Sequence, residues 1–345
     1  MTVEEITTDP QSPTLARPGS PLACFGVNQS TTRLYFVGAG GLLSELQETP
    51  SGWQATGFEA PVTPDHGLAC FGLGGVEPRV YFVELHSGLM ELVHQNDQWL
   101  QQFPSGADYP ASRSPLTCAG GGGPDGRLYY VGNDAQVHEI SDDNTGNLQD
   151  QVLDGTTVAP GSGLTCKTDS NGLVMVFYVD STDNLLHVLA EISPQDGGGI
   201  INDAIKGTDP APGSALTCFN QEGTDNTRVY YLDRQNQINE LAWNGSTQTN
   251  NGPIAPAMPG SALTCFAVEG RLTRVYYLDD NAQINELAWR NGGWDYHLTL
   301  WKAARDSALT CYGVNGSATR LYYHDEQYRV TELALKGDRF VNTPL

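Results

Sequence analysis

The stretch SALTCFAVEGRLTRVYYLDDNAQINELAW, residues 261–289, reads as three short β-strands separated by polar turns. Runs rich in Val, Ile, Thr, Tyr and Phe that are bounded by Gly, Asn and Asp are typical of strands joined by tight turns. Almost the same words occur at residues 214–243, so we interpret the stretch as one unit of an internal repeat.

Seven cysteines mark this repeat along the chain. Each belongs to a phrase such as SALTCF, and the phrases begin at residues 20, 66, 114, 162, 214, 261 and 307. Every unit continues with a second strand like RVYYL, a third like QINELAW and a fourth, outer segment. Four short strands in roughly 45 residues are the signature of a β-propeller blade.

From this repeat we predict an all-β protein, a seven-bladed β-propeller of four-stranded antiparallel blades that forms a single domain over residues 1–345. The expected blades cover approximately residues 20–66, 67–113, 114–161, 162–213, 214–260, 261–306 and 307–345, after an N-terminal arm at 1–19. The arm either pairs with the last blade to close the ring or lies over it, since DRFVNTPL (338–345) already supplies a fourth strand there. A stack of separate sandwiches is the alternative fold, but it would not require seven near-equal units.

The net charge of −22 argues against binding to nucleic acid or to anionic membranes. No apolar run is long enough for a transmembrane helix, so no membrane insertion is expected. The start MTVEEITTDPQSP lacks the basic and apolar regions of a secretory signal. These features predict a cytoplasmic protein, or one exported without a classical signal peptide, and they leave the oligomeric state open.

The cysteines occupy one repeat position, which places them on a ring with one blade between neighbours. That separation exceeds what a disulfide bond spans, so we expect buried free thiols. No Cys-x-x-Cys or Cys/His pairing accompanies them, so no metal and no cofactor are predicted.

An arginine precedes a glutamate by 12 residues in six of the seven units. The pairs are Arg33 and Glu45, Arg79 and Glu91, Arg127 and Glu139, Arg228 and Glu240, Arg274 and Glu286, and Arg320 and Glu332. At the same spacing, blade four has Met175 and His187. One interpretation is a cross-strand ion pair that stabilises each hairpin by about 0–1 kcal/mol; the other is a repeated binding site.

Aromatic residues recur at fixed distances from these glutamates. Trp243 and Trp289 follow the glutamate of their own unit by three residues. Trp53, Trp99, Trp294 and Phe340 follow it by eight. A guanidinium donates a fork of hydrogen bonds, a carboxylate accepts from hydroxyls, and an aromatic face covers the C–H side of a pyranose. The combination therefore favours carbohydrate binding.

The words in RVYYLDDNAQINELAWRNGGW (274–294) resemble the fucose-binding β-propeller lectins of the Aleuria type. The resemblance covers nearly the whole chain after residue 19. It implies sites between adjacent blades, with Arg and Glu from one blade and Trp or Tyr from the next, which hold L-fucose without a metal. Two features depart from that family: it usually has six blades, and its first-strand Trp is replaced here, by Phe25 in blade one and by Lys167 in blade four, for example.

Carried over residue by residue, the resemblance implies four complete sites. They combine Arg228 and Glu240 with Trp289 and Trp294, Arg33 and Glu45 with Trp99, Arg274 and Glu286 with Phe340, and Arg320 and Glu332 with Trp53. The pairs Arg79/Glu91 and Arg127/Glu139 face blades that lack an aromatic residue at these positions. Blade four, with Met175 and His187, should have lost its site.

We therefore predict a lectin, not an enzyme, that recognises L-fucose or fucosylated glycans at several sites of one rigid ring. Several weak sites on one body raise the apparent affinity for glycan-dense surfaces. A protein-interaction scaffold and a glycosidase-like propeller enzyme are the alternatives. No G-x-S-x-G, HExxH or sialidase-type box occurs, and residues repeated around a ring fit many equal sites better than one catalytic centre.

Overall fold

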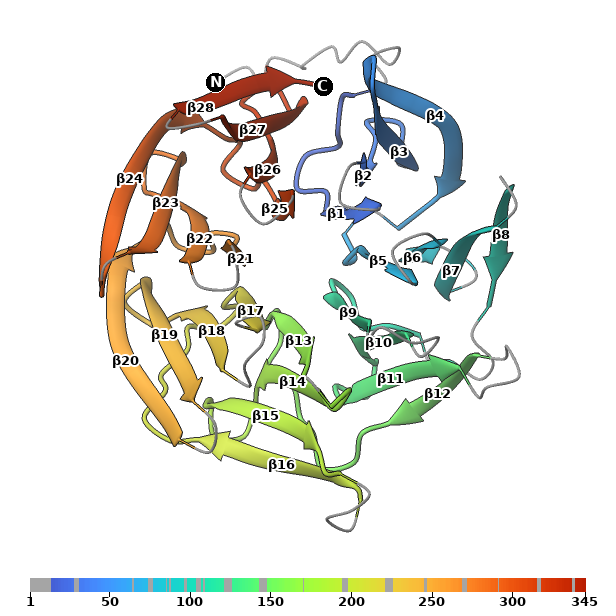
Figure 1. Ribbon diagram of the computed structural model, residues 1–345. Helices are drawn as coiled ribbons and strands as arrows, with labels where there is room; N and C mark the ends of the chain where they lie inside the picture. The colour runs from blue at the N-terminus through green and yellow to red at the C-terminus, as the bar shows by residue number, and fades with distance from the viewer. Residues whose placement is uncertain are drawn as a thin grey trace, which may run out of the picture.

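The computed structural model describes residues 14–345 except 28–30, 64, 74–76, 85, 87, 96–97, 104–106, 108, 121–125, 143–147, 170, 194–197, 221–225, 245–246, 269–271, 291, 315–317 and 337–338. The described residues form seven four-stranded antiparallel sheets that radiate from a common axis (Figure 1). The predicted seven-bladed propeller of four-stranded antiparallel blades is confirmed. No helix long and apolar enough to cross a membrane is found in the described part of the chain.

Each blade is a meander whose strands follow one another from the axis outward. Blades one to three are built from β1 (Leu22–Val27), β2 (Thr31–Val37), β3 (Leu42–Thr49) and β4 (Gly52–Pro61); β5 (Ala69–Leu73), β6 (Glu77–Glu84), β7 (Gly88–Gln95) and β8 (Gln98–Gln102); and β9 (Leu116–Gly120), β10 (Gly126–Val131), β11 (Val137–Asp142) and β12 (Leu148–Val152). Blades four and five are built from β13 (Leu164–Thr168), β14 (Val174–Val179), β15 (Leu186–Glu191) and β16 (Ile200–Ile205); and β17 (Leu216–Asn220), β18 (Thr227–Leu232), β19 (Gln237–Asn244) and β20 (Thr247–Pro256). Blades six and seven are built from β21 (Thr264–Val268), β22 (Leu272–Leu278), β23 (Gln283–Arg290) and β24 (Gly293–Lys302); and β25 (Leu309–Val314), β26 (Ala318–His324), β27 (Val330–Lys336) and β28 (Arg339–Pro344).

The second strand of each blade is buried on both faces because a neighbouring blade covers each face. Tyr230 of β18, for example, packs toward blade six, whereas Tyr231 packs toward blade four. Successive strand residues point to opposite faces, so a strand covered on both sides needs consecutive apolar residues. This explains why RVYYL reads as a continuous run rather than an alternating one.

The first strands carry the seven cysteines, which are free and half-buried rather than fully buried as expected. At five junctions a threonine of one blade lies within hydrogen-bonding distance of the cysteine of the next, as for Thr217 Oγ1 and Cys265 Sγ at 3.2 Å. The other four contacts join Thr117 to Cys166, Thr165 to Cys218, Thr264 to Cys311 and Thr310 to Cys24, at 3.1–3.3 Å. Burial raises the pKa of the Cys24 thiol to about 12, so these thiols stay protonated and serve as contacts between blades.

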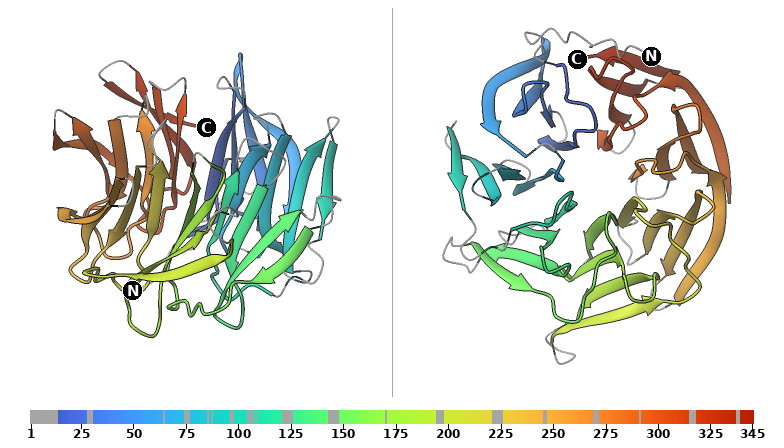
Figure 2. Two further views of the ribbon diagram at one scale, coloured as in Figure 1. Left: turned by 60° about the horizontal axis from the view of Figure 1, so that its bottom comes forward. Right: turned by 180° about the vertical axis from the view of Figure 1, so that it is seen from behind.

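Blades one and seven lie side by side where the ring closes, and both views of Figure 2 show this junction as part of the same ring. Blade seven owns its fourth strand, β28, and the arm does not replace it. The arm instead bridges the two blades: Ala16 N donates to Tyr328 O at 2.8 Å, and Ala39 N donates to Leu15 O at 2.9 Å. The same type of bridge joins Ala303 to Asp325 where a covalent link connects two blades. Of the predicted arm, residues 1–13 lie outside the described residues.

Candidate functional site

Each arginine of the repeated pair lies on the second strand of its blade, and each glutamate lies on the third. In blade six the register places Glu286 opposite Tyr276, the residue two positions after Arg274. Residues i and i+2 of a strand share a face, and cross-strand partners share it too. The arginine, tyrosine and glutamate therefore point together toward the next blade.

The tyrosine donates its hydroxyl hydrogen to the glutamate in all six blades that carry the pair. The six bonds run from Tyr35 to Glu45, Tyr81 to Glu91, Tyr129 to Glu139, Tyr230 to Glu240, Tyr276 to Glu286 and Tyr322 to Glu332, at 2.5–3.2 Å. Sequence reasoning missed the role of these tyrosines. The signal was the constant Arg-x-Tyr spacing, since only strand register reveals that the tyrosine faces the glutamate.

The glutamates are buried, with 0–7% of each residue exposed. The arginine Nη1 lies 2.5 Å from the carboxylate in the Arg33/Glu45 and Arg274/Glu286 pairs. Burial alone would lower the pKa of Arg33, but the Glu45 carboxylate more than offsets it and the net pKa is raised. Burial, together with Glu45, raises the pKa of Tyr35 well above its usual value. The triad therefore presents a fixed cation and a fixed hydrogen-bond acceptor.

Several polar atoms of the triads have no hydrogen-bond partner among the described residues. These buried atoms are the Nε groups of Arg33, Arg79 and Arg274 and the Oε2 atom of Glu91. A buried donor or acceptor without a partner costs about 1–3 kcal/mol.

In blades one, two, six and seven, the residues three and eight positions after the glutamate form a cross-strand pair that closes the site of the preceding blade. Between blades five and six this pair is Trp289 and Trp294, directly opposite each other on β23 and β24. Their ring centroids are 5.4 Å apart at 71°, and the Trp294 ring lies 6.0 Å from the ring of Tyr230. Trp289 keeps 38% of its surface exposed. We call this the five–six site and name the other sites in the same way.

Arg228 in the five–six site is arranged differently from the other arginines. Its Nη1 donates to the carbonyl oxygens of Thr227 and Trp243, at 3.0 and 3.2 Å. Its partner Glu240 accepts hydrogen bonds from Tyr230 and from Asn251, at 2.7 and 2.5 Å. The carboxylate is thus held in place by neutral donors.

Three further junctions bring the predicted aromatic residue to the triad. In the one–two site, the ring centroids of Trp99 and Tyr35 are 6.2 Å apart. In the seven–one site, the ring centroids of Trp53 and Tyr322 are 5.6 Å apart. Phe340 packs in the cluster that contains Tyr276, in the six–seven site. The structure therefore brings together the residues of all four sites for which an aromatic partner was expected.

The two–three and three–four sites have no aromatic residue at the corresponding place. Leu148 of blade three lies in the cluster that contains Tyr81. In the three–four site, Ile200 of β16 occupies the place of the aromatic residue, opposite Glu191. These junctions match the sequence prediction of triads without an aromatic face.

Blade four requires a correction. His187 does not occupy the glutamate position: it pairs with Tyr178, whereas Val188 pairs with Phe177. Six residues, 180–185, separate the last cross-strand pair of β14 and β15, whereas five, 233–237, separate the last pair of β18 and β19. The extra residue shifts the register by one and turns His187 to the other face of the sheet.

Blade four has therefore lost the whole triad: Met175 replaces the arginine, Phe177 the tyrosine and Val188 the glutamate. Trp243 of blade five fills the junction instead, with its ring 5.5 Å from that of Phe177. The four–five junction is an apolar contact between blades, and the prediction of a lost site agrees with this packing.

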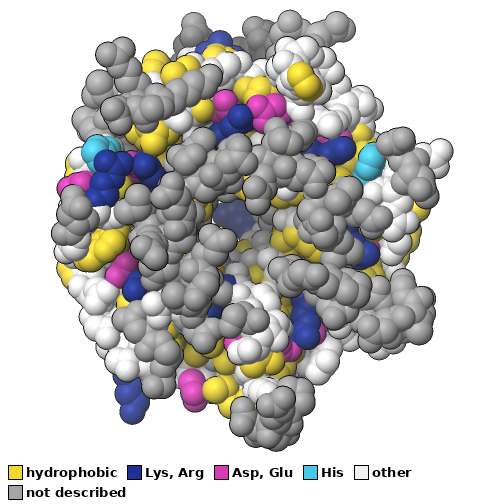
Figure 3. All heavy atoms as spheres, viewed as in Figure 1, with side chains coloured by type: hydrophobic (Ala, Val, Ile, Leu, Met, Phe, Trp, Pro, Cys, Tyr) yellow, Lys and Arg dark blue, Asp and Glu magenta, His cyan; other side chains and the backbone are white. Residues whose placement is uncertain are grey.

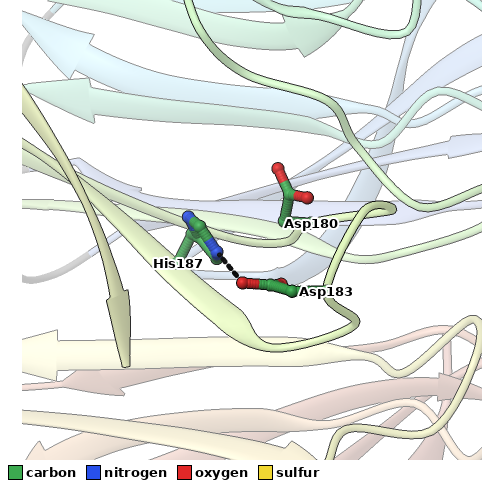
Figure 4. A group of neighbouring side chains, drawn as sticks. All are labelled: Asp180, Asp183 and His187. Atoms are coloured by element: carbon green, nitrogen blue, oxygen red, sulfur yellow. Dashed lines mark hydrogen bonds and ion pairs between the residues drawn. The ribbon is translucent and has the colours of Figure 1, made fainter. Parts of the chain in front are cut away.

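One group of described side chains offers donor atoms of the kind that bind metal ions: Asp180, Asp183 and His187, with ligand atoms within 4.8 Å of one another (Figure 4). His187 Nε2 lies 3.0 Å from Asp183 Oδ2, and Asp180 Oδ1 accepts from the backbone N of Thr182 at 2.7 Å. In blade three, His138 makes the same contact with the aspartate four residues before it. We therefore interpret the group as turn-stabilising contacts, at the opposite end of the hairpin from the triads.

On the face seen in Figure 3, Lys and Arg side chains appear at separate places around the ring, several of them beside acidic side chains. The combination of a cation, a carboxylate and an aromatic face at repeated junctions of a propeller is typical of a carbohydrate-binding protein, a lectin.

Comparison with known families agrees with this class. A family model described as fungal fucose-specific lectin matches residues 11–224 and 209–344. The chain therefore belongs to the fungal fucose-specific lectin family, whose members bind carbohydrate and are not enzymes. No curated protein sequence matched the chain.

Solved lectin structures share the fold. BP39L lectin from Burkholderia pseudomallei superposes with a TM-score of 0.74 at 16% identity, over 94% of this chain and 98% of that one. SapL1 lectin in complex with alpha methyl fucoside gives a TM-score of 0.60 at 23% identity, over 81% and 95%. A fungal lectin structure from Aleuria aurantia, described as a six-bladed β-propeller, gives 0.55 at 18% identity, over 82% and 95%. The present chain has seven blades.

Proposed function

We propose that this lectin binds L-fucose and fucosylated glycans at its inter-blade sites, and that the five–six site is the strongest. The observation that carries the proposal is the triad itself, seen in full in the one–two site: a buried carboxylate held by a tyrosine, beside an arginine, next to an aromatic residue of the following blade. The complex of SapL1 with a fucoside supports the choice of fucose as ligand.

The chemistry of a deoxy sugar suits this arrangement. The arginine donates to the ring oxygen and a hydroxyl, and the carboxylate accepts from a second hydroxyl, both as charge-assisted hydrogen bonds. The aromatic face covers the C–H side of the pyranose, and the methyl group of fucose adds apolar area that is withdrawn from water. Since the triads are rigid and buried, little conformational entropy is lost when the sugar binds.

Several such sites on one ring act together on a surface dense in fucose. Binding of one site makes the next event intramolecular, and avidity exceeds the affinity of any single site without a new contact. A glycan array should therefore show fucosylated structures, and free fucose should compete. An array without fucose-dependent signal at high protein concentration would contradict the proposal.

The five–six site allows a matched test with two tryptophans of equal exposure. Trp289 is 38% exposed and belongs to the site, whereas Trp301 is 39% exposed and lies outside all of them. We expect Trp289→Ala to weaken binding of alpha methyl fucoside at one site roughly tenfold or more, since an aromatic pair is worth about 0.5–1.5 kcal/mol beyond its buried area. Trp301→Ala should leave calorimetric titrations unchanged, and equal effects of both variants would refute the assignment.

A further inference from the structure

The residue three positions after the glutamate faces the arginine of the preceding blade, and its identity differs between sites. It is Trp289 in the five–six site, Leu335 in the six–seven site and His94 in the one–two site, each opposite the aromatic residue of its own blade. This residue is a carboxylate in blade one (Glu48, opposite Trp53), in blade three (Asp142, opposite Leu148) and in blade four, where Glu191 stands three residues after Val188 and opposite Ile200. Ion pairs with the arginine of the preceding blade are described for two of them, Glu48 and Glu191. A carboxylate at this place changes which partners the arginine has.

Glu48 captures the arginine of the seven–one site. Arg320 Nη1 lies 2.6 Å from Glu48 Oε2 but 3.3 Å from its own partner, Glu332. In the one–two and six–seven sites, where the residue is His94 or Leu335, the arginine stays on its own glutamate, at 2.5 Å for both Arg33 and Glu45 and Arg274 and Glu286. Arg320 Nη1 therefore lies between two carboxylates: it donates a hydrogen bond to Glu332 and forms an ion pair with Glu48 of blade one across the junction.

The three–four site repeats this arrangement independently. Arg127 Nη1 contacts Glu191 Oε1 and lies 3.6 Å from Glu139. The other oxygen of Glu191 accepts a hydrogen bond from the backbone N of Val174 at 2.8 Å, so the carboxylate is fixed in its position. Two sites at different junctions thus show the same inter-blade ion pair.

An ion pair of this kind competes with a neutral sugar for the same hydrogen-bond donor. The guanidinium group that would donate to the sugar is engaged by a second carboxylate in addition to that of its own glutamate, and a charge-assisted bond is stronger than one to a neutral hydroxyl. The carboxylate also stands where Leu335 or Trp289 offers apolar surface in other sites. A sugar would have to displace the carboxylate before it could reach the arginine.

We propose that Glu48 masks the seven–one site, and Glu191 the three–four site, so that these triads bind neutral fucosides weakly or not at all in the native protein. The aromatic face of Trp53, which the sequence places in the seven–one site, is then not sufficient for fucoside binding there. Position three after the glutamate is the specificity-determining position of each site. This inference rests on the proposed fucose-binding function.

A reciprocal exchange tests it. Glu48→Leu gives the seven–one site the residue that faces Arg274 in the six–seven site, and Glu48→Gln removes the charge with little change of volume. Leu335→Glu installs the carboxylate in the six–seven site. Glu59→Leu on the same blade removes an equal charge from an exposed position away from the sites and serves as the control.

The probe is alpha methyl fucoside, and the readout is the number of sugars bound per chain by native mass spectrometry and by calorimetric titration. We expect both Glu48 variants to bind one sugar more than the native protein, Leu335→Glu to bind one fewer, and Glu59→Leu to match the native protein. Thermal unfolding of each variant shows whether the ring remains folded.

Failure of this inference and failure of the proposed function give different results. If the native protein binds the fucoside but neither folded Glu48 variant binds an additional one, the mask is refuted and fucose binding stands. If neither the native protein nor any variant binds it, the proposed function is wrong and the inference falls with it.

Discussion

A buried histidine just before the β26–β27 turn of blade seven offers a direct test of how the propeller tolerates polar atoms between its blades. His324 ends β26 with 0% of its surface exposed, and neither ring nitrogen has a hydrogen-bond partner among the described residues. Burial lowers the pKa of His324 to about 4, although Asp306 and Asp325 partly offset the effect of burial. Blades five and six place Leu232 and Leu278 at the same register position.

We expect His324→Leu to stabilise the protein and to remove part of its sensitivity to acid. The variant gains stability because two buried nitrogens without partners among the described residues, at about 1–3 kcal/mol each, are replaced by an apolar side chain. The pH dependence has a definite sign. The unfolded chain takes up a proton at this histidine below its ordinary pKa near 6.5, whereas the folded chain does so only near pH 4, so stability falls as the pH drops between these values.

The size of this effect follows from the difference between the two pKa values. At 1.36 kcal/mol per unit, the native protein should lose about 3 kcal/mol between pH 7.5 and pH 4 through this group. Urea unfolding of both proteins at half-unit steps of pH measures it, because the difference between the two unfolding curves isolates His324 from the other titrating groups. A difference that stays constant over this range would show that His324 is protonated or hydrated in the folded state and would refute the reasoning.

Two further predictions concern contacts that repeat around the ring. Tyr230→Phe should lower the free energy of unfolding by about 1–3 kcal/mol, since buried Glu240 loses a hydrogen-bond donor, and it should weaken fucoside binding at the five–six site. The double variant Tyr230→Phe with Glu240→Val, the combination found in blade four, should regain stability but not fucoside binding. Recovery of binding in the double variant would contradict the role of the triad. Thr217→Val should cost only about 0.5–1.5 kcal/mol in chemical unfolding, because it removes a single contact with Cys265 and leaves the packing volume unchanged. A loss several times larger would mean that the threonine–cysteine contacts act as one cooperative ring.

The fold was predictable because each blade repeats the same solution to the same packing problem. A phrase such as SALTCF recurs with the first strand, and RVYYL recurs wherever a strand is covered on both faces. The number of blades did not depend on any single segment, because the repeat phrase occurs seven times along the chain. The role of the N-terminal arm was left open, because a few backbone bridges leave no periodic pattern in the sequence.

The charged and aromatic residues of the sites were predictable from the sequence. The strand register of blade four and the competition between two glutamates for one arginine were not. Counting twelve residues from Met175 leads to His187, yet one additional turn residue makes Val188 the structural equivalent. Spacing alone does not distinguish a longer turn from a longer strand. The capture of Arg320 by Glu48 was also invisible, because it depends on which residue of the next blade reaches across the junction.

The bridges made by the arm at residues 14–17 have a consequence for the order of the chain. They reproduce, without a covalent connection, the geometry that the inter-blade links provide elsewhere, as at Ala303. The ring therefore does not depend on where the polypeptide starts. Joining Leu345 to the arm through a short linker and opening the chain at another link, such as the one at residues 206–211, should produce a circularly permuted protein with the same seven blades, the same sites and a seam at a different junction.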